Sequence, residues 1–241
     1  MANYQQAVLN LSDAHNLGLS SRHVSVDEEI VVRSTTLNGQ NRQCSIHYVA
    51  SPNWENQSSG CILLHGGSGD WRHYAMNFHA IVPQVACVAP VLPGFGGSSK
   101  VVEDTLEAIA APIVNLVQSI PWEKTTLVGF SFGALVAAEV ALHCNVDRLM
   151  LISPAGFGDH SPEMMAMRTQ AADIARREGL QAGLKFNLER IMLHRVKYEQ
   201  QESLLLLMEE MLLATKAKVR KFSRRELLVD RLKSYSGQLR V

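Results

Sequence analysis

The sequence has no excess charge of either sign, because 23 lysine and arginine residues balance 23 aspartate and glutamate residues. A chain without net charge creates no long-range field that would attract nucleic acid or anionic lipid. The basic stretch at 216–233 interleaves its charges with leucine and valine at helical spacing, which is typical of a solvated helix face. We therefore expect neither nucleic acid nor a membrane among its partners.

Long apolar runs and closely spaced cysteines are also missing. No segment approaches the ~18 consecutive apolar residues of a membrane span, and the first residues lack the basic start and apolar core of a secretory leader. The cysteines show no CxxC spacing and lie mostly inside apolar runs, which is typical of buried free thiols in a reducing compartment. They are Cys44, Cys61, Cys87 and Cys144. We expect a cytoplasmic protein with no metal and no cofactor.

Short apolar runs alternate with helical patterns between His23 and Pro154. This alternation predicts an α/β fold with a mostly parallel central sheet and flanking helices. The runs at 24–36 and 43–51 predict an antiparallel pair that enters the sheet. Later runs rich in valine, leucine and isoleucine predict buried strands at 61–66, 85–94, 125–130 and 147–156. The last of these, which contains DRLMLIS, is expected to be covered on both faces.

From Ser161 onward the chain shows helical periodicity almost to its end. Ser161 and Pro162 form a helix start, and Ser223 with Glu226 predicts a capping box for a final helix through Tyr235. We therefore expect a core at 1–160, a helical cap at 161–235 and the start of a further core strand at 236–241.

The segment GFSFG places Ser131 between Gly129 and Gly133, directly after a predicted strand and before a predicted helix. A GxSxG motif in this context forms a sharp turn that exposes the serine hydroxyl, and glycines on both sides avoid collisions. The following helix directs its N-terminal N–H groups at the same point, which favours developing negative charge. The competing interpretation is that Ser131 only caps the helix.

A second glycine-rich turn, in LLHGGSGDW, follows another predicted strand through His65, Gly66 and Gly67. Together with LPGFGGSS at 92–99 and the GFSFG motif, it gives the chain a resemblance to the α/β-hydrolase superfamily, in the branch with a helical cap, from about Ser21 through the cap. The resemblance implies an α/β-hydrolase fold with all three motifs at one sheet edge. Val91 stands where aspartate is common in that family.

The resemblance implies roles for individual residues. Ser131 would be the nucleophile, and the backbone N–H groups of Gly67 and Phe132 would form the oxyanion hole. His65 would shape its loop together with Gly66, rather than transfer protons. Further residues are expected to line a pocket for a small-molecule substrate, namely Trp71, Met164 and Met192.

The remaining members of a catalytic triad are not evident. The family places an acid after the cap and a histidine near the C-terminus, and the sequence shows neither. A helix that starts at Ser131 carries His143 roughly 18 Å away at 1.5 Å per residue, so His143 is excluded as the base. His194 is expected to be a packing or surface residue, whereas the neighbours Asp159 and His160 could reach the serine. The missing triad members lead us to expect that the C-terminal part of the core is absent.

These observations predict a serine hydrolase acting on carboxylic esters or related acyl compounds through an acyl-enzyme. A carbon–carbon bond hydrolase is an alternative. A catalytically impaired fragment and a non-catalytic binding protein also remain open. The oligomeric state is not predicted.

Overall fold

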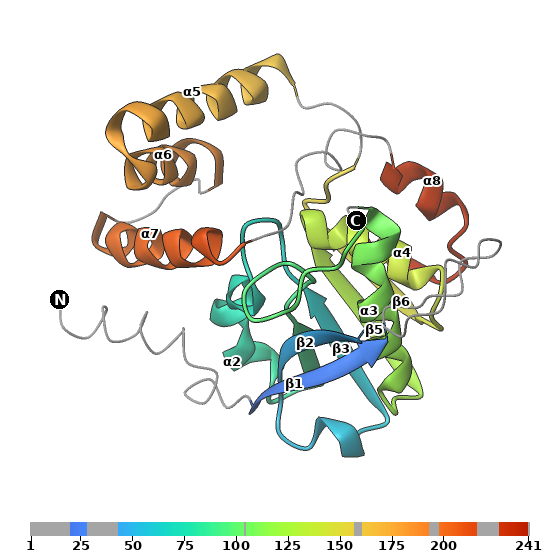
Figure 1. The fold of residues 1–241 in the computed structure, drawn as a ribbon. Coiled ribbons are helices and arrows are strands. Elements are labelled where there is room, and N and C mark those ends of the chain that lie inside the picture. The colour runs from blue at the N-terminus through green and yellow to red at the C-terminus, as the bar shows by residue number, and fades with distance from the viewer. Residues whose placement is uncertain are drawn as a thin grey trace.

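A seven-stranded sheet forms the centre of the protein in this computed structural model, which describes residues 20–27, 43–103, 105–156, 161–192, 198–215 and 227–240 (Figure 1). The strand order is β1-β2-β4-β3-β5-β6-β7. The strands are β1 Ser20–Asp27, β2 Gln43–Ala50, β3 Ser59–Leu64, β4 Ala86–Pro90, β5 Lys124–Phe130, β6 Arg148–Ile152 and β7 Gln238–Arg240. β1 and β2 are antiparallel, and β4, β3, β5, β6 and β7 run parallel. The predicted mostly parallel α/β sheet is confirmed.

The register of the parallel strands brings three loops to one edge of the sheet. Leu64 at the end of β3 is opposite Gly129 of β5, and Phe130 is opposite Ile152 of β6. The turn after β3, the turn after β5 and the loop after β6 therefore begin side by side. This carboxyl edge is where open α/β sheets bind ligands.

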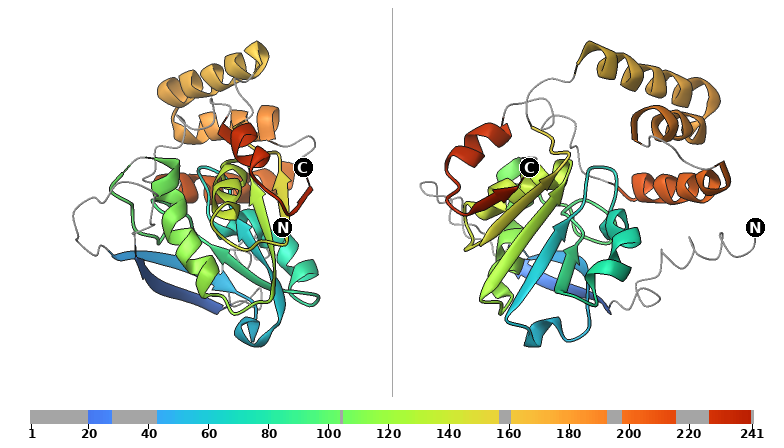
Figure 2. Two further views of the ribbon diagram at one scale, coloured as in Figure 1. Left: turned by 90° about the vertical axis from the view of Figure 1, so that its right-hand side faces the viewer. Right: turned by 180° about the vertical axis from the view of Figure 1, so that it is seen from behind.

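Helices cover both faces of the sheet but not evenly (Figure 2). The 3-10 helix η3 Trp71–Asn77 and α2 Phe78–Ile81 lie on one face. On the other lie α3 Leu106–Ser119 and α4 Phe132–Ala141, and every residue of α4 is buried. A short 3-10 helix, η2 Trp54–Asn56, precedes β3.

The expectation that the strand in DRLMLIS is covered on both faces is wrong. Leu149 and Leu151 of β6 are buried, but Met150 and Ile152 on the opposite face are 41% and 40% exposed. The reason is that α4 packs on one face of β6, while η3 and α2 lie over β3 on the other side of the sheet, away from β6. In β6, therefore, a continuous apolar run does not indicate that both faces of the strand are buried.

The described helices after Ser161 lie in two places, above the sheet edge and against the core. The first group stands above the carboxyl edge of the sheet and consists of α5 Pro162–Glu178, α6 Leu180–Asn187 with the following π-helical turn η4 Leu188–Met192, and α7 Tyr198–Leu213 (Figure 1). Ser161 caps α5 by accepting the N–H of Met164 at 3.3 Å. Within the described ranges, no helix is both long and apolar enough to cross a membrane.

The second group is the single helix α8 Leu227–Lys233, which packs on the core. Leu228 is fully buried, and its N–H donates to the carbonyl of Gly156 at 3.2 Å. Arg231 pairs with Glu139 of α4 and, at 2.8 Å, with Glu107 of α3. The cap predicted at 161–235 includes α8; below, the word cap is used only for α5, α6, η4 and α7. The predicted capping box at 223–226 lies outside the described residues.

Candidate active site

Ser131 lies between β5 and α4 with a left-handed φ of 54° and a ψ of −114°. Hydrogen bonds fix this backbone on both sides, since Ser131 N–H donates to Ile152 O at 2.9 Å and Ser131 O accepts from Ala155 N–H at 3.0 Å. The side chain makes no capping hydrogen bond to α4. The hydroxyl is therefore not engaged in the helix cap that was the competing interpretation.

Gly129 and Gly133 allow the backbone to pass very close to its neighbours. A Cβ atom on Gly129 would lie 2.5 Å from Gly133 O and from Ala134 Cα. One on Gly133 would overlap the backbone oxygens of Leu64 and His65. Because backbone cannot move aside as a side-chain tip can, both positions require glycine. The spacing of GFSFG thus follows from how β3, β5 and α4 meet.

Gly66 brings the turn after β3 against the serine. A Cβ atom on Gly66 would lie 3.3 Å from Ser131 Cβ and 3.0 Å from the ring of Phe130. Gly67 follows in the same turn, and Phe132 begins α4 on the other side of Ser131. The N-terminal end of α4 carries the positive end of the helix dipole. This positive end favours negative charge beside Ser131.

His65 is completely buried and ties two motifs together. Its Nε2 accepts the N–H of Leu92 at 2.9 Å, so its proton lies on Nδ1, which donates to Gly66 O at 2.8 Å. Burial, reinforced by the charge of His73, lowers the pKa of His65 to about 4. With both ring nitrogens engaged, His65 has no lone pair with which to accept the proton of Ser131.

The segment at 92–99 is held by a serine hydroxyl and an aromatic ring. Ser98 Oγ donates to Val91 O at 2.7 Å and accepts the N–H of His47 at 3.0 Å. Phe95 is fully buried and meets the ring of His65 edge-on, with 5.0 Å between centroids. Val91, at the position where the family commonly has aspartate, is itself buried. Apolar packing and the Ser98 hydroxyl thus hold this loop.

An ion pair that the sequence analysis missed supports the turn after β3. Asp70 caps η3 and accepts three side-chain hydrogen bonds from the guanidinium of Arg72, at 2.7 to 3.1 Å. Burial alone would raise the pKa of Asp70, but the hydrogen bonds and charge of Arg72 outweigh it and hold that pKa below its ordinary value. Arg72 also donates to Glu210 of α7 at 2.9 Å and so links the turn to the cap.

Of the other predicted residues, the structure describes the side chains of three. Trp71 is buried in the core against Phe78, with 6.1 Å between ring centroids. Met164 is half-buried on α5, and the side chain of Met192 lies outside the described part. His143, at the far end of α4, is 3.3 Å from Glu139. Asp159, His160 and His194 lie outside the described residues.

The serine turn between the parallel strand β5 and the helix α4, next to the glycine turn after β3 at the carboxyl edge, has the strand–turn–helix geometry of the GxSxG motif. Residues 61–232 match the alpha/beta hydrolase family, and the chain belongs to this family.

Among curated proteins, one relative is the "Dihydrolipoyllysine-residue acetyltransferase component of acetoin cleaving system" of Pseudomonas putida. It is 31% identical over 101 residues, which cover 41% of this chain and 27% of the relative. The chain thus matches less than a third of that protein's length.

Solved structures share the fold at low sequence identity. A bacterial membrane phospholipase A aligns over 99% of this chain and 73% of its own, with a TM-score of 0.69 and 20% identity. A thermophilic esterase from Thermogutta terrifontis aligns over 90% and 88%, with a TM-score of 0.56 and 17% identity. The family and these structural neighbours are hydrolases.

Proposed function

We propose that this protein is a serine hydrolase that cleaves carboxylic esters or related acyl compounds through an acyl-enzyme at Ser131. The strained backbone of Ser131 is the observation that carries the proposal. A non-glycine residue in such a conformation costs of the order of 1–3 kcal/mol and persists where its surroundings enforce it. Here the enforcing contacts are the hydrogen bonds to Ile152 and Ala155 and the close passage at Gly129 and Gly133. A protein that only bound a ligand would gain nothing from this strain.

In this mechanism Ser131 Oγ attacks the carbonyl carbon and the carbonyl oxygen becomes negatively charged. The N–H groups of Gly67 and Phe132 receive that charge, and each such donor typically contributes ~3 kcal/mol of transition-state stabilisation. Collapse of the tetrahedral intermediate releases the alcohol and leaves the acyl group on Ser131. Attack by water then releases the acid and restores the serine.

The proton of Ser131 passes to a base in this scheme. His65 is excluded because both of its nitrogens are occupied. His160, next to Asp159 in the sequence, is our candidate because it follows β6, which ends at the same edge of the sheet as Ser131; both residues lie outside the described part of the chain.

Transfer of the acyl group to an acceptor other than water is the second candidate function. The Pseudomonas putida relative is named an acetyltransferase component, which favours this candidate. Both functions share the acyl-enzyme and differ only in the acceptor. Hydrolysis is our first choice because the family and the structural neighbours with esterase and phospholipase names are hydrolases.

A fluorophosphonate probe tests the nucleophile. We expect labelling at Ser131, located by peptide mass spectrometry, and its loss in Ser131→Ala. Ser119→Ala is a matched control, because that hydroxyl only donates to Leu116 O at the end of α3. Labelling at another serine, or undiminished labelling of Ser131→Ala, would overturn the assignment. Adding a primary alcohol to a p-nitrophenyl ester assay separates the two functions: free acid indicates hydrolysis, and a new ester indicates transfer.

A further inference from the structure

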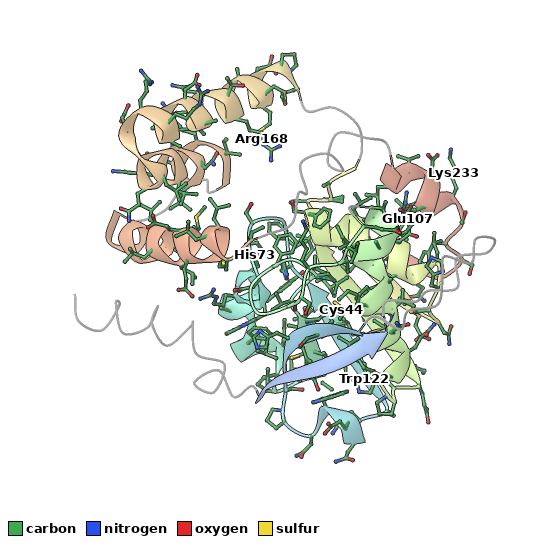
Figure 3. The ribbon with its side chains drawn as sticks, viewed as in Figure 1. Cys44, His73, Glu107, Trp122, Arg168 and Lys233 are labelled. Carbon is green, nitrogen blue, oxygen red and sulfur yellow. The ribbon has the colours of Figure 1, made fainter. Side chains whose placement is uncertain are left out.

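His73 contacts the turn that supplies the proposed oxyanion hole. It lies in η3, and its Nδ1 accepts the N–H of Gly66 at 3.1 Å. Figure 3 shows His73 at the end of the core that is nearest the cap. The catalytic scheme above assigns it no role, although it binds the glycine at which an added Cβ would lie 3.3 Å from Ser131 Cβ.

The tautomer of His73 follows from this hydrogen bond. Because Nδ1 accepts, a neutral His73 carries its proton on Nε2. Burial lowers the pKa of His73, Asp70 opposes this effect, and Arg72 reinforces it. The centroid of the ring lies 5.5 Å from that of Phe130 and 6.1 Å from that of His65. The lone pair of Nδ1 is thus spent on the backbone and not available to Ser131.

Gly66 is held from both sides by a histidine. Its N–H donates to His73, and its carbonyl accepts from Nδ1 of His65. These two groups belong to the two peptide planes that flank the Gly66 Cα atom. Since a glycine has no Cβ to restrict its backbone, its φ and ψ are fixed here largely by what holds these planes.

The second of these planes also contains the N–H of Gly67. In a trans peptide the N–H points away from the carbonyl of the same plane, and the described residues include no cis peptide. The direction of Gly67 N–H therefore depends on the orientation of the whole Gly66 unit. His65 holds the carbonyl of that plane, and His73 prevents the preceding plane from rotating with it.

From these contacts we propose that His73 is a positioning residue for the oxyanion hole. It holds Gly66 in the conformation that presents Gly67 N–H beside Ser131, and this role rests on the proposed function. Gly69 provides independent support, because a Cβ atom there would overlap ring atoms Cε1 and Nε2 of His73. Gly69 is not among the glycines with positive φ, so the backbone conformation does not require glycine there. The absence of a side chain at Gly69 instead leaves room for the ring of His73.

Two substitutions at one position separate positioning from packing. In His73→Asn the amide oxygen can take the place of Nδ1 as the acceptor, whereas His73→Leu fills the space without an acceptor. We expect His73→Leu to lower kcat for p-nitrophenyl acetate by about 10- to 100-fold with little change in KM, because a 1 Å misplacement can cost ~10²-fold. His73→Asn should recover most of kcat. Gly69→Ala should resemble His73→Leu, because it displaces the ring.

The backbone can be monitored without any assay of activity. In spectra of protein labelled with ¹⁵N-glycine, the amide proton of Gly66 should move upfield in His73→Leu and return toward its wild-type position in His73→Asn. Equal kcat in wild type and His73→Leu, or an unchanged Gly66 amide, would overturn the proposal. If the wild-type protein neither hydrolyses esters nor reacts with fluorophosphonate, the proposed function fails, and the amide resonance alone decides whether His73 holds Gly66.

Discussion

The end of the core around Ser131 and the cap are built in different ways. Around Ser131 the backbone is fixed by hydrogen bonds to neighbouring loops and by glycines that touch other backbone. The cap instead buries a few side chains on itself, including Ala171, Leu184, Leu188 and Met211. One polar link from the cap to the core is the ion pair of the exposed Glu210 with Arg72.

This difference indicates that the core and the cap have separate functions. Catalytic geometry needs atoms fixed to within a fraction of an ångström, and contacts between backbone segments supply that. A cap with its own small core can shift or change its side chains without disturbing the backbone around Ser131. We therefore expect the core to determine the chemistry and the cap to determine which acyl chains enter, with Met164 among the contributing residues.

Replacing glycine with alanine at one site in each region should give the largest contrast. Gly133→Ala places a Cβ atom into the backbone of Leu64 and His65, and we expect it to lower the free energy of unfolding by about 4 kcal/mol or more. Gly179→Ala in the cap meets nothing within 4 Å and strains only a φ of 100°, which costs about 1–3 kcal/mol. Urea titrations of both variants check this. Similar losses in the two variants would contradict the comparison.

Arg72 joins the two regions, because it pairs with Asp70 in the core and with Glu210 in the cap. Removing each partner in turn therefore compares a core contact with a cap contact. Arg72→Met leaves the buried carboxylate of Asp70 unpaired, and breaking a buried pair costs about 3 kcal/mol. The turn after β3 should loosen as well, so kcat should fall. Thermal unfolding and ester hydrolysis measure the two effects. The double variant Asp70→Asn with Arg72→Met should recover part of the stability, because no unpaired charge remains.

Acid should weaken the core through its buried histidine. The folded-state pKa of His65 is about 4, below the ordinary value of 6.5, so the unfolded chain binds a proton first as the pH falls. The stability is fully present above pH 6.5 and is lost progressively toward pH 4, by about 2 kcal/mol at pH 5. His73, whose pKa is also lowered, adds to this loss. Urea titrations at pH 7 and 5 check the slope, which should be shallower in His65→Gln.

Glu210→Gln, at the cap end of the network, should have the smallest effect. The Glu210 side chain is 67% exposed, and an exposed ion pair is worth about 0–1 kcal/mol and is screened by salt. We expect an almost unchanged melting temperature and a shift in KM for esters with long acyl chains. The wild-type protein should show the same shift in KM only at high salt, where the ion pair is screened. A strong loss of stability would mean that the cap is part of the core.

The sequence predicted the surroundings of Ser131 better than it predicted the cap. The roles of Gly129 and Gly133 are local, since a strand-turn-helix with a central serine demands glycine at those positions. The pairing of Arg72 with Glu210 joins residues 138 apart, and no local pattern reports it.

Two further features depend on the packing of distant elements. Met150 is exposed because no described helix covers its face of β6, although the apolar run around it predicts a buried strand. α8 joins the core through Leu228 and Arg231, whose partners lie on earlier segments and in α3 and α4. His73 is near the glycine turn in sequence, but its acceptor role appears only once η3 folds back on Gly66.

The most direct test of the central claim is to trap the acyl-enzyme. The protein is mixed with p-nitrophenyl acetate, quenched in acid within one turnover, and digested for mass spectrometry. The account predicts one acetyl group, on the peptide that contains Ser131, and none on Ser131→Ala, with ester hydrolysis by that variant reduced to the background rate. An acetyl group on another residue, or hydrolysis by Ser131→Ala at the wild-type rate, would contradict it.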